Sequence, residues 1–402
     1  MMPNMRHVLP LSILLLLTSC TTPNTKTTSP TECPDPNTQL EVTSDQDTTE
    51  AAQKNTLKNY TNTIDKPLSF TSKGLTFNAT LTLPATSSKS PSKFPGVLIL
   101  QDWGKPSQLG TTRGSLGYQL PVEVQVYQSL AQELAQLGFA VLRYDKRNCI
   151  QDTQNTCTYP REALEPHLNT LANTLTEDAN NALETLRQQP EVSTARIAII
   201  GHGQGAEIAA ALTTSSSHPP AALVLLAPSM FPIHKIASYQ TDYSLDTSEQ
   251  QLARQSAGST ADLIQQQINM LKNEQVEHKS LALALSEEKP VLKSAFGLPL
   301  NTWKGFAVLH ANAMTALSRK DLPQTLALLG ALDADLPDSN ERILTDVVHK
   351  NPRARMEILS DTTHDMIIIQ DDPEDDSPTP PSLHPDLAGL ISTFLYSALT
   401  AP

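Results

Sequence analysis

The chain has 402 residues, 39% of them hydrophobic, which is enough to build the core of one large domain or two ordinary ones. Its 42 acidic residues outnumber 29 basic ones, giving a formal net charge of -13. This balance excludes an extended basic face, and we expect no nucleic-acid partner.

The first residues resemble a bacterial lipoprotein signal peptide. Arg6 precedes an apolar run from Val8 to Leu17, which at about ten residues is too short to span a bilayer. The run ends in Leu17-Thr-Ser-Cys20, small residues before a cysteine at which cleavage and lipid attachment would occur. We predict a signal peptide over residues 1–19 and a membrane anchor through lipidated Cys20, with the protein in the cell envelope, facing the periplasm or the exterior. An ordinary secretory signal is the alternative.

Residues 20–62 are rich in Thr, Pro and Ser and show no apolar periodicity, which predicts a disordered tether. The ordered domain is expected over residues 63–400. It opens with alternating apolar residues at 68–70 and 75–83, typical of an antiparallel hairpin.

Apolar strands then alternate with amphipathic helices, a pattern that indicates a mostly parallel sheet. The stretch at about 230–310 is polar and glutamine-rich with helical periodicity, and we expect it to form a helical cap over the sheet. The remaining expected strands are 96–100, 140–144, 195–200, 222–227, 325–329 and 354–359, and the expected helices are 124–137, 175–188, 206–212, 340–349 and 385–399.

The most informative motif is Gly201-His202-Gly203-Gln204-Gly205, which lies between a β-branched strand and an alanine-rich helix. It has the form G-x-S-x-G with Gly203 at the serine position. A nucleophile elbow strains its central residue, usually into positive φ, and glycine adopts that conformation freely. Gly203 can therefore keep the turn while deleting the hydroxyl.

The elbow and the segment from Leu137 to Arg147 resemble the α/β-hydrolase superfamily, in its serine esterase and prolyl-peptidase-like branch. The resemblance covers roughly residues 65 to 400. It implies an α/β-hydrolase fold, with a mostly parallel central sheet flanked by helices and a helical cap insertion.

The resemblance also implies an acid after the next-to-last strand and a histidine after the last one. Asp333 is the predicted triad acid, with Asp335 as its competitor, and His364 is the predicted base. Without a serine this base has no nucleophile to activate. His202 occupies a flanking position in which histidine is common in the family.

The expected oxyanion hole consists of the backbone N–H groups of Trp103 and Gln204. The family usually has His-Gly after this strand, whereas here the strand runs into Gln101-Asp102-Trp103. Asp102 would bring a carboxylate close to a site meant to stabilise an oxyanion.

Cys149 and Cys157 flank a short polar loop, and an oxidising envelope makes a disulfide between them plausible. Cys33 would then be unpaired in the tether.

An acidic run at 371–376 matches no EF-hand spacing and favours a solvated loop over calcium binding. Ser229 follows a strand but lacks an elbow. We expect neither a metal nor a cofactor.

Three hypotheses about function follow. The first is a catalytically impaired pseudo-hydrolase that retains a pocket for an acyl, ester or peptide ligand. The second is an active ester or peptide hydrolase that uses His364 as a general base toward water, or a nucleophile not yet recognised. The third is an envelope tethering or assembly lipoprotein, and the fold by itself does not choose among them.

Overall fold

A computed structural model describes residues 60–86, 93–104, 107–147, 149–151, 157–158, 164–369 and 380–400. All of them belong to one compact unit, Lys58–Pro402. The predicted signal peptide with Cys20, the tether up to residue 59 with Cys33, and the acidic run at 371–376 lie outside the described residues.

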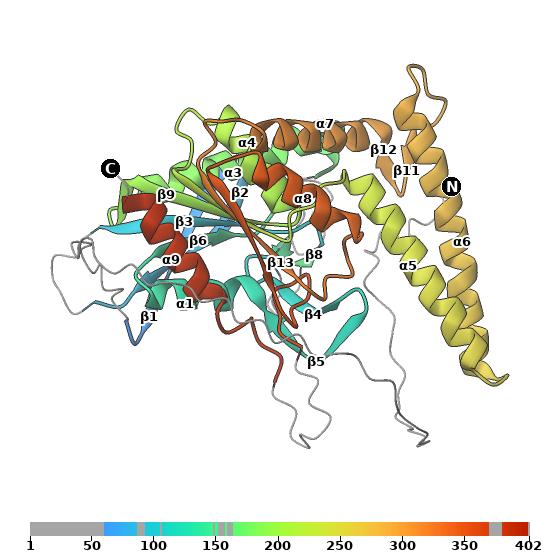
Figure 1. Cartoon of the computed structure of the whole chain (residues 1–402). Coiled ribbons are helices and arrows are strands. Elements are labelled where there is room, and N and C mark those ends of the chain that lie inside the picture. Colours follow the sequence, from blue (N-terminus) through green and yellow to red (C-terminus); the bar gives the residue numbers. More distant parts are fainter. Residues whose placement is uncertain are drawn as a thin grey trace, which may run out of the picture. The chain divides into compact units, whose positions relative to one another are not determined.

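An eight-stranded sheet organises this unit (Figure 1), in the order β1-β2-β6-β3-β9-β10-β13-β14. β1, β2 and β6 pair antiparallel, and from β6 onward every neighbouring pair is parallel. The predicted α/β-hydrolase fold is confirmed. The strands of this sheet are β1 (Thr63–Ser72), β2 (Leu75–Pro84), β3 (Phe94–Leu100), β6 (Ala140–Tyr144), β9 (Val192–His202), β10 (Ala222–Leu226), β13 (Gln324–Gly330) and β14 (Ala354–Leu359).

Helices cover both faces of the sheet. The described helices are α1 (Val126–Gln136), the short η1 (Glu165–Thr170), α3 (Leu171–Arg187), α4 (Gln204–Ser215), α5 (Ile233–Arg254), α6 (Ser259–Ser286), α7 (Leu300–Leu317), α8 (Ser339–His349) and α9 (Leu387–Thr400). Three small hairpins complete the description: β4 (Thr111–Ser115) with β5 (Tyr118–Gln125), β7 (Ile150–Gln151) with β8 (Cys157–Thr158), and β11 (Ser294–Ala295) with β12 (Leu298–Pro299).

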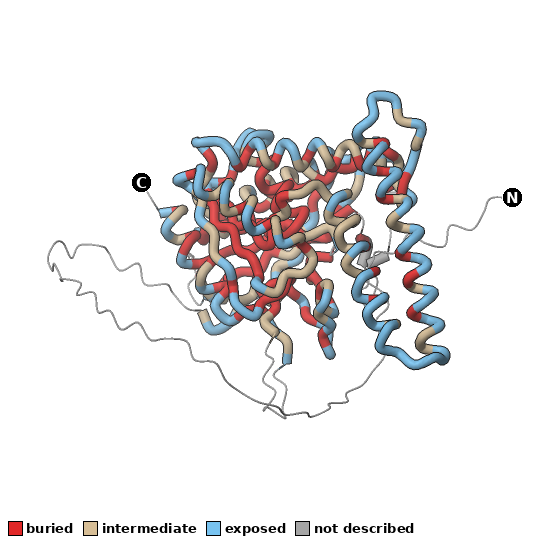
Figure 2. The backbone as a smooth tube through the Cα atoms, turned by 45° about the vertical axis from the view of Figure 1, so that its right-hand side comes forward, coloured by how far each residue is buried: buried red, intermediate tan, exposed pale blue. Residues whose placement is uncertain are grey.

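The central strands are apolar on both faces because each face packs against helices. In β3, Leu98 and Leu100 join the core cluster that contains residues of α3, α4 and α7. Val97 and Ile99 point the other way, into the cluster that contains residues of α1 and α9. This two-residue alternation within a continuous apolar run is the pattern of a strand buried between two helical layers, and Figure 2 shows the resulting buried centre.

The region predicted as a cap is helical, but its helices have two different roles. Leu245 of α5 packs against Ile264 and Ile268 of α6, and these two helices form a hairpin beside the sheet domain (Figure 1). In α7, Phe306 and Leu309 instead belong to the main core cluster. The prediction of one cap over 230–310 is therefore corrected, because α7 is part of the layer that covers the sheet.

The β4–β5 hairpin was missed by the sequence analysis. The expected helix at 124–137 begins only at Val126, because Val124 is still paired with Thr112 in this hairpin. Its turn uses Gly117 with φ of 83°, a conformation that favours glycine. Among the described residues, the helices are all too short or too polar to cross a bilayer.

Close backbone packing around the elbow depends on glycine. A Cβ on Gly205 would overlap the carbonyl oxygen of Leu100, at the end of β3. Because that neighbour is backbone in a central strand, it cannot move away cheaply. Gly389 in α9 provides a contrast, since an added Cβ there meets no atom within 4 Å.

We predict that Gly205→Ala lowers the free energy of unfolding by at least about 2 kcal/mol. Gly389→Ala is the matched control and should raise it by up to about 1 kcal/mol, because alanine loses less conformational entropy in a helix. Urea denaturation followed by circular dichroism measures both. Equal effects of the two substitutions would contradict the packing described here.

Candidate active site

The elbow has the strand-turn-helix geometry that its sequence predicts. β9 ends at His202, α4 begins at Gln204, and Gly203 between them has φ of 51° and ψ of -114°. The turn thus presents the backbone of Gly203 at the N-terminus of α4, where unpaired N–H groups and the helix dipole favour an anion.

His364 and Asp333 lie together in the arrangement of a triad base and its acid. Nδ1 of His364 is 2.8 Å from Oδ2 of Asp333. The competitor Asp335 instead accepts the backbone N–H of Leu116 at 3.0 Å. Of the two carboxylates, Asp333 is the one that holds the imidazole, and it does so through the loops that follow β13 and β14.

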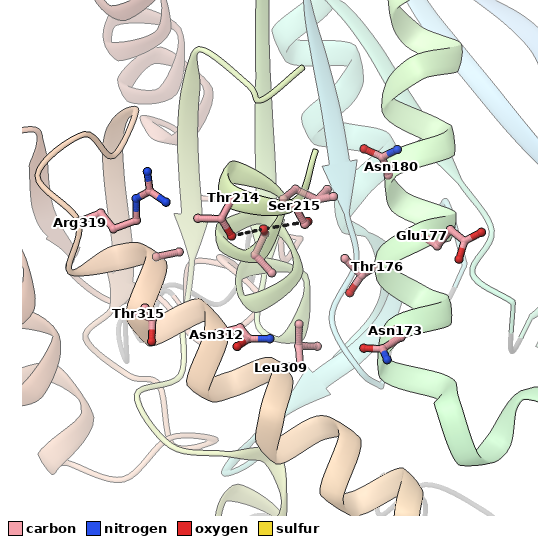
Figure 3. A pocket seen from close by; sticks show the side chains of 13 residues that line it. Asn173, Thr176, Glu177, Asn180, Thr214, Ser215, Leu309, Asn312, Thr315 and Arg319 are labelled. Atoms are coloured by element: carbon pink, nitrogen blue, oxygen red, sulfur yellow. Dashed lines mark hydrogen bonds between the residues drawn. The ribbon is translucent and has the colours of Figure 1, made fainter. Parts of the chain in front are cut away.

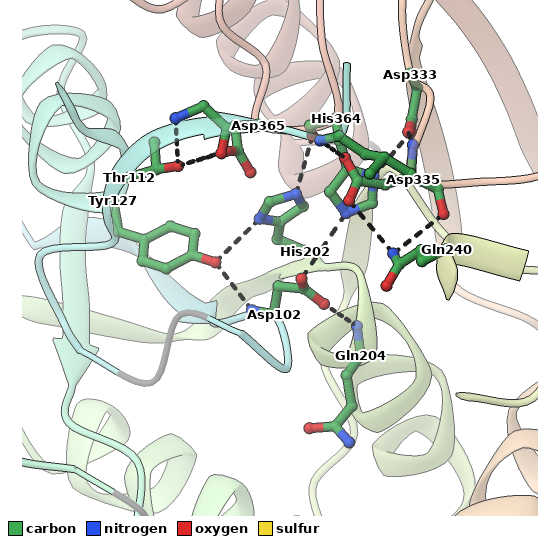
Figure 4. A network of polar contacts seen from close by, with 12 residues as sticks. Asp102, Thr112, Tyr127, His202, Gln204, Gln240, Asp333, Asp335, His364 and Asp365 are labelled. Atoms are coloured by element: carbon green, nitrogen blue, oxygen red, sulfur yellow. Dashed lines mark hydrogen bonds and ion pairs between the residues drawn. The ribbon is translucent and has the colours of Figure 1, made fainter. Parts of the chain in front are cut away.

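Asp102 lies between Gln204 and His364 (Figure 4), in the space that a serine side chain at position 203 would need. A Cβ built on Gly203 would overlap Oδ1 of Asp102. The same oxygen accepts the backbone N–H of Gln204 at 2.9 Å, and Oδ2 lies 3.8 Å from Nε2 of His364. One carboxylate therefore fills the nucleophile's position and takes a hydrogen bond from a predicted oxyanion-hole donor.

The other predicted donor, Trp103, has a structural contact through its side chain. Its ring packs edge-on against Phe306 of α7, with centroids 5.0 Å apart. This contact fixes the chain immediately after Asp102 against the helical layer.

A chain of hydrogen bonds connects the backbone of Asp102 to the backbone of His364. The backbone N–H of Asp102 donates to the hydroxyl of Tyr127 at 2.9 Å, and that hydroxyl lies 3.0 Å from Nδ1 of His202. Nε2 of His202 is 3.0 Å from the carbonyl oxygen of His364, which can only accept. The chain is satisfied when His202 carries its proton on Nε2 and Tyr127 donates to Nδ1.

Three consecutive residues after β6 connect the site to its surroundings. Asp145 accepts the backbone N–H of Gln108 at 2.9 Å, in the segment that follows Asp102. Arg147 forms a two-bond ion pair with Asp178 of α3, at 2.7 and 2.9 Å. These partners explain how charged residues can follow a fully buried strand.

Lys146, between them, donates to the carbonyl oxygen of Asp102 at 3.0 Å and to Oε1 of Gln204 at 3.1 Å. It thereby bridges the loop after β3 and the first turn of α4. Burial lowers the pKa of Lys146 to about 8, although Asp102 acts in the opposite direction. Lys146 is still mainly an ammonium at neutral pH.

The surroundings of His364 favour its protonated form. Burial by itself would lower the pKa of its imidazole, but the carboxylates of Asp333 and Asp102 outweigh burial and raise the pKa well above 6.5. An imidazolium has no lone pair with which to accept a proton. Protonation therefore competes with the use of His364 as a general base.

Asp333, Asp335 and His364 present possible metal-ligand atoms within 4.8 Å of one another. Asp333 already bonds His364, and Asp335 already accepts from Leu116. A metal ion would have to break these bonds, so we assign no metal site to them.

Sequence reasoning did not identify Tyr127 or Lys146 as parts of the site. Neither lies in a catalytic motif, and both reach the site only through packing between distant segments.

Cys149 is disulfide-bonded, whereas the side chain of Cys157, its predicted partner, lies outside the described residues. Ser229, which follows β10, donates its hydroxyl to the carbonyl of Phe231 at 2.8 Å.

We predict that His364 remains protonated at pH 7 and that Asp102→Asn lowers its pKa, because the substitution removes one of the carboxylates that raise it. Histidine side-chain NMR over a pH titration measures this. Since folding raises the pKa, the ion pairs stabilise the fold below the unfolded pKa of about 6.5, and this stabilisation is lost as pH rises through the folded pKa.

His234 serves as the internal control in the same titration. Burial, with neighbouring Lys235, lowers the pKa of His234 to about 4, so it should be neutral at pH 7. A neutral His364 in the wild type at pH 7, or an unchanged pKa in the variant, would contradict the charge assignment.

Comparison with solved structures finds distant likenesses. The structure is similar to a hypothetical protein from Pseudomonas aeruginosa, at 12% identity over 87% of this chain and 98% of that one, with a TM-score of 0.47. It is also similar to Est1E from Butyrivibrio proteoclasticus, at 13% identity over 83% and 99% of the two chains, with a TM-score of 0.44. At these values neither likeness carries an argument about activity.

A search of curated proteins finds no match. The family model described as "Serine aminopeptidase, S33" matches residues 122–371, which is more than half of the chain and includes Gly203, Asp333 and His364. The chain therefore belongs to the S33 serine aminopeptidase family of the α/β-hydrolase superfamily.

Proposed function

We propose that this chain is a catalytically silent member of its family, a pseudo-hydrolase whose site is occupied by its own Asp102 carboxylate. The single observation that carries the proposal is the position of Oδ1 of Asp102, which accepts the N–H of Gln204 and fills the space beside Gly203. Three physical consequences support it.

The first consequence concerns the nucleophile. Covalent acyl transfer needs a side-chain oxygen or sulfur at the elbow, and Gly203 has no side chain. Removing one triad member typically leaves only about 10³ to 10⁴-fold catalysis over water, which comes from substrate binding and the oxyanion hole.

The second consequence concerns the catalysis that substrate binding and the oxyanion hole could still provide without a serine. Asp102 uses the N–H of Gln204 that would otherwise stabilise an oxyanion, and it places negative charge where negative charge would develop. A substrate oxygen would have to displace a hydrogen-bonded carboxylate and would be repelled by it.

The third consequence concerns charge balance. His364 lies against the carboxylates of Asp102 and Asp333, and the ammonium group of Lys146 bonds the main-chain carbonyl oxygen of Asp102. The two carboxylates offset the positive charge that an anionic transition state would need. They also favour the protonated form of His364, which opposes the general base that the second hypothesis requires.

We predict that the wild type and Gly203→Ser are both silent, because the new side chain would overlap the Asp102 carboxylate. Asp102→Ala/Gly203→Ser should show turnover at least about 100-fold above the wild type, because it frees the Gln204 N–H and returns His364 toward neutrality. The substrates are p-nitrophenyl esters of short and long acids and, given the family's name, amino-acid p-nitroanilides.

Two controls accompany this experiment. Adding His364→Ala to the double variant should abolish turnover, and a fluorophosphonate probe should label only proteins in which the introduced serine is activated. Turnover by the single Gly203→Ser variant equal to that of the double variant would show that Asp102 does not block the site. Wild-type turnover that depends on His364 would establish the active-hydrolase alternative.

We further propose that lipidated Cys20 anchors the protein to a membrane of the bacterial envelope. The proposal rests on the apolar run from Val8 to Leu17 and the small residues before Cys20. Cells fed an alkyne-tagged fatty acid should incorporate the tag into the wild type and not into Cys20→Ser. Equal labelling of both proteins would refute the anchor.

A further inference from the structure

Two places on the described surface lie away from the elbow and are open to a partner. The groove between α3, α4 and α7 (Figure 3) is lined by side chains such as Thr214 and Ser215, whose hydroxyl groups donate to a carbonyl oxygen of their own helix. We assign no ligand to this groove. The outer edge of the large sheet, formed by β14, carries a more specific pattern.

Among the described residues, β14 pairs with a neighbouring strand on one side only. That neighbour is β13, to which β14 runs parallel. The carbonyl oxygens of Arg353 and Leu359, at the two ends of β14, accept N–H groups of the segment that contains β13. The odd-numbered residues therefore turn their main-chain groups inward. Because successive residues of a strand turn these groups to opposite sides, Met356 and Ile358 point theirs outward.

The side chains of β14 alternate between the two faces of the sheet. Met356 packs against the core cluster that includes a residue of α8, and Ile358 on the same face is 42% exposed. Arg355 and Glu357 lie on the other face, where the Arg355 guanidinium is 5.1 Å from the ring centre of Phe394 in α9. The edge therefore combines outward main-chain groups with an exposed apolar side chain on one face and two opposite charges on the other.

A second copy of the same strand complements this pattern. If the two strands run antiparallel with Met356 opposite Met356 of the other copy, the outward main-chain groups of these two residues pair with each other. The N–H of Ile358 then meets the carbonyl oxygen of Ala354. In the same register Arg355 of each copy lies opposite Glu357 of the other, in the antiparallel pair type whose side chains are closer. Hydrogen bonds and charges thus favour the same alignment.

Neighbouring registers that keep the main-chain pairing bring like charges together. Centring the pair on Arg355 sets that arginine opposite its own copy, and centring it on Glu357 sets two carboxylates opposite each other. Centring it on Ala354 places Arg353 opposite Arg355. Like charges directly opposite on antiparallel strands are destabilising. Among these alignments, the one about Met356 makes both cross-strand charge pairs attractive.

We propose that β14 is a dimer interface, at which two copies of this chain join their sheets edge to edge about Met356. The joined strands form one continuous sheet that runs through both copies. Ile358 is covered on the α8 face, where the small Ala354 of the other copy leaves room for it. The two charge pairs between Arg355 and Glu357 fix the register on the α9 face. The interface does not depend on the state of Asp102.

Charge reversal at the two positions tests the proposal by sedimentation velocity of the purified full-length protein, in a neutral density-matched detergent. About 0.15 M salt screens the repulsion between two chains of net negative charge. The wild type should sediment as a dimer. Glu357→Arg and Arg355→Glu should each raise the dissociation constant of the dimer at least about tenfold, because both cross-strand pairs become like-charge pairs. An equimolar mixture of the two variants should dimerise again, since each charge then faces its opposite.

Glu123→Arg is the matched control, because Glu123 is an exposed strand carboxylate that pairs with Arg113 at 3.0 Å in the β4–β5 hairpin. It should leave the dimer unchanged, and circular dichroism should show every variant folded. A wild type that is monomeric at about 100 µM would overturn the proposal. So would a dimer that persists in both single variants, or a mixture of the two that stays monomeric.

Discussion

The candidate site depends on one hydrogen bond, from the backbone N–H of Gln204 to Oδ1 of Asp102. In a serine hydrolase of this fold, that N–H is expected to face the developing oxyanion. Here a permanent anion from the neighbouring strand holds it. Gly203 is the companion change, because only a residue without Cβ leaves room for the carboxylate. The two departures from the family pattern are therefore one structural change with two parts.

The rest of the site is consistent with that change. A partly buried anion just beyond the end of β3 favours nearby cations: Oδ2 of Asp102 lies 3.8 Å from Nε2 of His364, and Lys146 bonds the main-chain carbonyl oxygen of Asp102. The imidazole in turn remains bonded to Asp333, so the base and acid of the ancestral arrangement are kept as parts of an ion network. Burial and pairing can preserve catalytic-looking geometry without preserving the free base that catalysis needs.

Much of the fold could be predicted from the sequence, because apolar runs such as 222–226 and the elbow motif are local signals. The β4–β5 hairpin could not, since it is short and exposes much of its surface. Asp333 and His364 followed from chain order, and the structure brings them together. The proximity of Asp102 to the site was expected, but its occupation of the space beside Gly203 depends on packing between β3 and α4. The contacts of Tyr127 and Lys146 are likewise properties of the three-dimensional arrangement.

The site as described requires the Asp102 carboxylate to accept the N–H of Gln204. The most direct measurement is the amide proton chemical shift of Gln204 in the wild type and in Asp102→Ala, by NMR of deuterated protein. A charge-assisted hydrogen bond predicts a downfield amide proton in the wild type that moves upfield when the carboxylate is removed. An amide proton with the same shift in both proteins would show that Asp102 does not occupy the oxyanion position.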